Sequence, residues 1–64
     1  MSFSENLKAA RKAKNMSQQD FADLMHTDRS TISKYETTGS YSLAANIFKL
    51  CEILEISFDD LFKE

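Results

Sequence analysis

The sequence predicts an all-α domain of five short helices, and three observations support this fold class. The 64 residues contain no proline and one glycine, Gly39, whereas all-β folds use both residue types in their many turns. Apolar residues recur at the spacing of a helix face along the chain. Serine or aspartate, which cap helix N-termini well, precedes most of these stretches. A chain of this length supports one domain, residues 1–64, with a modest core.

The first two helices are predicted from capping signals followed by apolar stripes. Ser2 stands three residues before Glu5 in the spacing of a capping box, and the helix that follows should end near Asn15, a residue that tolerates left-handed backbone. Ser17 and Asp20 repeat the capping spacing at the start of the second helix. The face that this second helix is expected to bury consists of Phe21, Ala22, Leu24 and Met25.

The third helix is predicted to begin at Asp28 as its N-cap and to bury Ile32 and Tyr35. Only His26 and Thr27 separate it from the second helix. Helices joined this tightly cross at about 90–120°, the helix-turn-helix arrangement, here spanning about residues 17–36. The small side chain of Ala22 permits the close crossing. Plain helical bundles also use tight corners, so the spacing alone leaves DNA binding and a bundle without DNA both open.

The fourth and fifth helices follow the turn-rich link TTGSYS around Gly39. The fourth is predicted from Ser42 to about Leu54, with a stripe formed by Leu43, Ile47, Leu50 and Leu54 and widened by Phe48, Cys51 and Ile53. The last helix should run from Ser57 to Phe62, with Ser57 and Asp60 at its cap. Its inward side chains are predicted to be Phe58, Leu61 and Phe62.

The charge distribution is compatible with nucleic-acid binding although the net charge is −2. Residues 1–36 carry six basic and five acidic groups, whereas residues 37–64 carry two basic and five acidic groups. An acidic second half that faces away from DNA lowers non-specific affinity but leaves specific binding possible.

Several other functional classes are not supported by the residues present. The single cysteine, Cys51, excludes an internal disulfide, and one cysteine with one histidine, His26, cannot complete a structural zinc site. The chain has no catalytic constellation, Gly-rich phosphate loop or metal motif, so we expect no enzymatic activity, cofactor or small-molecule ligand. Its apolar stretches are too short to span a bilayer, and a free cysteine without an export signal favours a cytoplasmic location.

Three stretches of the chain, LKAARKAKNMSQQDFADLM, DRSTISKYE and LCEILEISFDDLF, resemble the Cro and phage-repressor helix-turn-helix family, also called the XRE family. The resemblance covers Leu7 to Phe62. It implies the compact five-helix fold of the lambda-repressor-like DNA-binding domains and a bacterial or phage origin. It also implies a transcriptional repressor that binds double-stranded DNA as a homodimer, on a two-fold symmetric operator read through the major groove.

The resemblance also implies roles for individual residues. Those that match base-reading positions of the recognition helix are Arg29, Ser30 and Lys34. Those that match phosphate-contacting or backbone-contacting positions are Gln18, with Ser17 as the cap of its helix, and, as second-line candidates, Thr31 and Ser33. Arg11 and Glu36 match an ion pair that ties the first helix to the end of the third and is mainly structural.

The chain departs from the family pattern at two places, and the second keeps another function in view. His26 stands at the tight turn, where the family has glycine, and the link TTGSYSLAA lacks the basic residues and the proline that the family places there. The uncharged link and the net acidity favour a protein-interaction module of antitoxin or anti-repressor type on the same fold. The basic side chains of Arg29 and Lys34 favour DNA binding instead.

Overall fold

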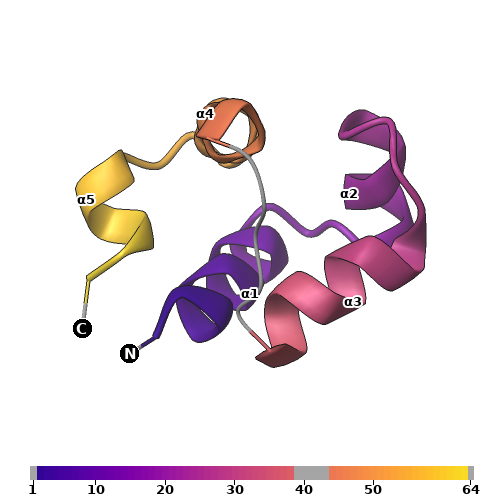
Figure 1. Ribbon diagram of the computed structural model, residues 1–64, viewed down its shortest axis with the longest axis horizontal. Helices are drawn as coiled ribbons and strands as arrows, with labels where there is room; N and C mark the ends of the chain where they lie inside the picture. Colours follow the sequence, from indigo (N-terminus) through magenta and orange to yellow (C-terminus); the bar gives the residue numbers. More distant parts are fainter. Residues whose placement is uncertain (1, 39–43, 64) are drawn as a thin grey trace.

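The computed structural model describes residues 2–38 and 44–63, and these residues form five helices and no strand. The helices, shown in Figure 1, are α1 (Phe3–Ala13), α2 (Gln18–Leu24), α3 (Arg29–Thr38), α4 (Ala44–Leu54) and α5 (Phe58–Leu61). The all-α prediction is therefore confirmed. Across the described ranges, the helices are too short or too polar to cross a membrane.

Helix α1 lies at the centre of the molecule, with α2 and α3 on one side and α5 on the other (Figure 1). It packs against α3 and α5, while α2 packs against α3 and α4 against α5. The first turns of α1 lie beside the C-terminal end of α5. The side-chain amide of Asn6 donates to the carbonyl oxygens of Leu61 and Lys63 at 2.9 and 2.6 Å, which satisfies two carbonyls that the end of α5 leaves open.

One hydrophobic core joins all five helices. Its buried members are Leu7, Phe21, Ala22, Met25, Ile32, Tyr35, Ile47, Leu50, Leu54 and Leu61. Each helix contributes at least one of them, so every helix of the described structure buries apolar surface in this shared core.

The predicted starts of α1, α2 and α5 are confirmed by their hydrogen bonds. Full capping boxes form between Ser2 and Glu5 and between Ser17 and Asp20. The Ser57 side chain accepts from the Asp60 backbone N–H at 3.0 Å at the start of α5. Each cap satisfies backbone donors that the first turn of a helix cannot satisfy itself.

Three helices end in a residue with left-handed backbone, and none of these residues is glycine. Their φ angles are 58° at Asn15, 57° at His26 and 56° at Glu55. The residue that follows each of them donates its backbone N–H to the carbonyl oxygen five positions before itself. Thr27 N–H, for example, donates to the Ala22 carbonyl oxygen at 2.9 Å. This closure reverses the chain within two residues. The left-handed turn predicted near Asn15 is confirmed. His26 has the same left-handed backbone, which glycine, the residue usual at this turn in the family, adopts more easily.

We expect His26→Gly to leave the free energy of unfolding unchanged or to raise it by up to about 1 kcal/mol. Glycine adopts left-handed backbone without the steric cost that an L-residue carries, although it gains entropy in the unfolded chain. Thermal unfolding followed by circular dichroism measures the change, with His26→Ala as the control that retains a Cβ and should not stabilise. A clear fall in melting temperature for the glycine variant would show that His26 contributes more than its backbone.

Three predictions of burial are wrong. Leu24 is 50% exposed, Phe48 is 68% exposed and Phe58 is 48% exposed. The side chain after a buried residue is turned by about 100° around the helix, so Phe48 faces away from the stripe that Ile47 belongs to. Leu24 lies at the edge of a short buried face for the same reason. Leu43 and the predicted start of α4 at Ser42 lie outside the described residues.

Candidate nucleic-acid interface

Helix α3 is anchored through one face and open on the other. Ile32 is fully buried and Tyr35 is 7% exposed, and both belong to the core. Ala22 on α2 is fully buried. Because its side chain is small, α2 and α3 can approach closely at the corner formed by His26 and Thr27. The sequence therefore places an amphipathic helix on the surface with its apolar side held by α1 and α2.

The three predicted base-reading side chains, Arg29, Ser30 and Lys34, are all exposed. At 100° per residue, Ser30 and Lys34 lie opposite the buried stripe, and Arg29 lies at the flank of the first turn. Thr37 is also exposed and falls on the same line, seven residues after Ser30. Thr37 was not among the residues predicted for this face, although Ser30, Lys34 and Thr37 are spaced at i, i+4 and i+7 along the sequence. Ser33 shares this side of the helix and is half-buried.

Asp28 caps the start of α3 by accepting hydrogen bonds from Thr31. The Thr31 backbone N–H donates to Asp28 Oδ1 at 3.1 Å, and the Thr31 hydroxyl donates to the same atom at 2.5 Å. These bonds hold the pKa of the exposed Asp28 carboxyl below its usual value. Because the Thr31 hydroxyl proton is already used, a phosphate contact by that group requires it to leave the cap.

We expect acid to weaken the Asp28 cap. The pKa of Asp28 is lower in the folded state than in the unfolded state, so its stabilising effect is complete above about pH 4 and is lost as the pH falls through the folded pKa. Asparagine caps equally well but does not titrate in this range. Melting temperatures of the wild type and Asp28→Asn, measured from neutral pH downwards, should therefore diverge below pH 4, with the wild type falling further. Parallel curves would contradict this assignment.

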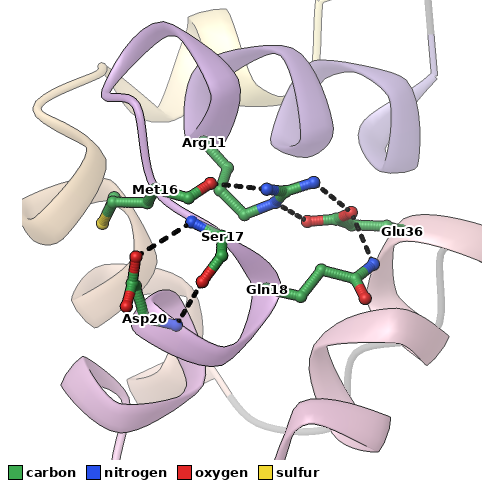
Figure 2. A network of polar contacts seen from close by, with 6 residues as sticks. All are labelled: Arg11, Met16, Ser17, Gln18, Asp20 and Glu36. Atoms are coloured by element: carbon green, nitrogen blue, oxygen red, sulfur yellow. Dashed lines mark hydrogen bonds and ion pairs between the residues drawn. The ribbon is translucent and has the colours of Figure 1, made fainter.

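The predicted ion pair between Arg11 and Glu36 is present and almost fully buried. Arg11 Nε lies 2.6 Å from Glu36 Oε2, and the two side chains are 8% and 3% exposed. Arg11 Nη2 donates to Glu36 Oε1 at 3.2 Å, and Nη1 donates to the Met16 carbonyl at 2.6 Å. Arg11 thus ties α1 and the link before α2 to the last turn of α3, as Figure 2 shows.

Gln18 joins the same network, which the sequence did not predict. Its Nε2 donates to Glu36 Oε1 at 3.1 Å, so the amide points toward the end of α3 (Figure 2). Its neighbour Ser17 accepts the Asp20 backbone N–H at 3.0 Å, which leaves the Ser17 hydroxyl proton free for another acceptor. Gln18 and Glu36 are 18 residues apart, and no local pattern signals such a contact.

The arrangement suits recognition rather than catalysis. Arg29 and Lys34 are exposed cations on α3, and the Gln18 amide keeps a second N–H donor. Burial raises the pKa of the Cys51 thiol, so the reactive thiolate form is disfavoured. Within residues 2–38 and 44–63, no three metal-ligating side chains come together.

Comparison with known proteins identifies the fold and the family. The sequence profile described as helix-turn-helix matches residues 7–61. The chain belongs to the helix-turn-helix family of DNA-binding transcriptional regulators. The proteins to which this helix-turn-helix chain is similar are regulators rather than enzymes.

The helix-turn-helix chain is 36% identical over 61 residues to the uncharacterized HTH-type transcriptional regulator YqaE of Bacillus subtilis. The match covers 95% of this chain and 53% of YqaE, so the chain spans about half the length of that relative. The restriction-modification controller protein C.AhdI of Aeromonas hydrophila is 35% identical, with a TM-score of 0.82 and coverage of 94% of this chain and 91% of C.AhdI.

The fold is also that of the P22 c2 repressor, solved in complex with a synthetic operator. The TM-score is 0.88, and the match covers 98% of this chain and 96% of the repressor. Identity is 24%, so this likeness is one of fold. The lambda-repressor-like architecture predicted from the sequence is thereby confirmed.

Proposed function

We propose that this protein is a cytoplasmic transcriptional repressor that reads one double-stranded DNA sequence with α3 and binds a two-fold symmetric operator as a homodimer. Residues 1–64 act as one DNA-binding domain. The observation that carries the proposal is the two-sided character of α3: Ile32 and Tyr35 fix it to the core, while Arg29, Ser30 and Lys34 project into solvent. A helix held in this way can enter the major groove without losing its own packing.

Each side chain of the proposed interface has a distinct task. Arg29 offers a planar fork that matches O6 and N7 of guanine, and Lys34 offers a single charged donor to guanine or to a phosphate. Ser30 donates or accepts and so tolerates several base edges. Gln18, Ser17, Ser33 and, after leaving the cap, Thr31 contact the sugar-phosphate backbone and set the register of α3 in the groove.

A row of four phenylalanines, contributed by α1, α4 and the segment around α5, supports the homodimer. Phe3 and Phe62 stack with ring centroids 5.2 Å apart, Phe58 lies 5.0 Å from Phe62, and Phe48 lies 6.1 Å from Phe58. Phe48 and Phe58 are exposed, whereas Phe3 and Phe62 are half-buried against the core. Exposed aromatic side chains such as these two are frequent at protein interfaces. In the proposed dimer, two copies of this row meet and two α3 helices lie about 34 Å apart, one helical turn of DNA.

We expect Phe48→Ser to weaken self-association by roughly tenfold or more, because it removes the most exposed phenylalanine of the row from the proposed contact. Sedimentation equilibrium of the wild type and the variant measures the change. Leu24→Ser is the matched control, since Leu24 is an exposed apolar residue of α2 away from the phenylalanine row. Equal dimer dissociation constants for the wild type and Phe48→Ser would mean that the dimer contact lies elsewhere on the protein.

A protein-interaction module is the second candidate function. The net charge of −2 and the exposed Phe48 and Phe58 favour it, because an acidic surface with apolar side chains suits a protein partner better than DNA. Salt dependence separates the two functions. Each phosphate neutralised by the protein adds about 0.9 to the slope of log affinity against log salt, so a slope near zero supports the protein partner.

Selection from a random duplex DNA library tests the main proposal. The purified protein is incubated with the library at low salt, and the retained duplexes are sequenced. A motif with two-fold symmetry would support both specific reading and dimeric binding, and its half-site spacing would give the geometry of the dimer. A folded protein that enriches no motif would support the protein-interaction module instead.

A further inference from the structure

Glu36 lies on α3, the helix that carries the proposed base-reading residues, and its carboxylate also contacts Gln18, a proposed phosphate donor on α2. It belongs to α3, two residues after Lys34, and it accepts from Gln18 at the start of α2. Its two carboxylate oxygens together accept three hydrogen bonds, two from Arg11 and one from Gln18. The position of the Gln18 amide is therefore fixed relative to α3 by one carboxylate.

We infer that Glu36 is a positioning residue for DNA binding, which holds the Gln18 side chain in the orientation that meets a phosphate while α3 lies in the groove. The inference rests on the proposed function. Gln18 Nε2 carries two protons, of which Glu36 takes one, so the second is available to a phosphate without breaking the bond to Glu36. A side chain already held in place loses less rotamer entropy when it binds.

Arg11 neutralises the negative charge of Glu36 close to the proposed phosphate contact. A bare negative charge next to the phosphate backbone would repel DNA, but the Arg11 guanidinium lies 2.6 Å away and neutralises it. Arg11 is itself fixed by the Met16 carbonyl at 2.6 Å, so neither group of the pair is left to move when DNA approaches. The ion pair thus supplies an acceptor for Gln18 with no net charge.

The neighbouring glutamine provides an internal contrast. The Gln19 amide donates to Asp23 Oδ1 at 2.9 Å, within α2 and on its exposed side. Gln18 and Gln19 therefore have the same chemistry and nearly the same place in the chain, yet only Gln18 is connected to α3. If Glu36 acts by positioning, Gln18 and not Gln19 is coupled to it in DNA binding.

The test is a double-mutant cycle in DNA affinity. The ion pair is replaced as a unit by Arg11→Met with Glu36→Leu, which keeps the net charge and removes every acceptor from Gln18. The probe is a labelled random-sequence duplex of roughly three helical turns at low salt, because base reading averages out over such a pool and backbone contacts dominate. Affinities are measured well below each variant's melting temperature.

We expect Gln18→Ala alone and the pair replacement alone each to weaken binding by about tenfold, the loss of one charge-assisted hydrogen bond. In the pair-replaced protein, Gln18→Ala should add less than about twofold, because the amide is no longer held. Gln19→Ala should have the same small effect in both backgrounds. Additive losses for Gln18 and the pair would overturn the inference while leaving the proposed function intact.

A second measurement decides the case in which the pair-replaced protein does not fold. The side-chain NH2 signals of Gln18 and Gln19 are followed by NMR in the wild type as the same duplex pool is added. Movement of the Gln18 signals with unchanged Gln19 signals supports the inference, and unchanged Gln18 signals overturn it. If the folded wild type does not bind the pool at low salt, both the proposed function and the inference fall.

Discussion

Arg11→Ala is expected to lower the free energy of unfolding by about 3–5 kcal/mol, because it leaves the carboxylate of Glu36 buried without its countercharge. Glu36 is 3% exposed at its side chain, so water cannot replace the guanidinium. The Met16 carbonyl also loses its donor. A domain of this size is stable by only a few kcal/mol, so the variant should be largely unfolded at physiological temperature.

Urea or thermal unfolding of the wild type and three variants checks this expectation. Lys12→Ala, the exposed neighbour of Arg11 on α1, should lie within about 0.5 kcal/mol of the wild type. Arg11→Met combined with Glu36→Leu should recover much of the lost stability, since an apolar pair has no charge to desolvate. A single Arg11→Ala variant within about 1 kcal/mol of the wild type would mean that the buried pair contributes little.

Arg29→Ala is expected to weaken binding to the selected operator by about 1–3 kcal/mol, which corresponds to roughly fivefold to more than a hundredfold. A two-pronged contact to guanine is lost, so preference at one base pair of each half-site should also relax. Because Arg29 is exposed at the start of α3, its removal should leave the melting temperature nearly unchanged.

The measurement is competition binding against operators that carry each single base change. Gln18→Ala is the comparison, since loss of a phosphate contact weakens all sequences alike and leaves discrimination intact. Lys12→Ala controls for the loss of one positive charge at an exposed position outside α3. If Arg29→Ala keeps wild-type discrimination at every position, the base-reading residues are placed wrongly on α3.

The helix boundaries could be predicted closely because their signals are local. A Ser2 or Ser17 side chain meets a backbone N–H three residues away, and Asn15 adopts left-handed backbone where its helix ends. Such contacts depend on a few consecutive residues, so the order of residue types contains most of the information. The turn at His26 followed from the two-residue link in the same way.

The candidate site was only partly predictable. The exposed positions of Arg29, Ser30 and Lys34 follow from helical spacing once Ile32 and Tyr35 are assigned to the core. The bond between Gln18 and Glu36 does not, because it depends on how closely the start of α2 approaches the end of α3. The exposure of Phe48 and Phe58 also depends on which neighbouring helix covers which side of α4 and α5.

The sequence by itself determined the helix-turn-helix in this protein: the caps at Ser17 and Asp28, the two-residue turn, and the small Ala22 at the crossing are all local features. The tertiary structure alone decided which polar groups meet across the chain. Asn6 reaches the carbonyl of Lys63 across 57 residues, and Gln18 reaches Glu36 across 18. The reason is physical: a helix forms from interactions within about four residues, whereas contacts between helices depend on packing angles that the whole core sets together.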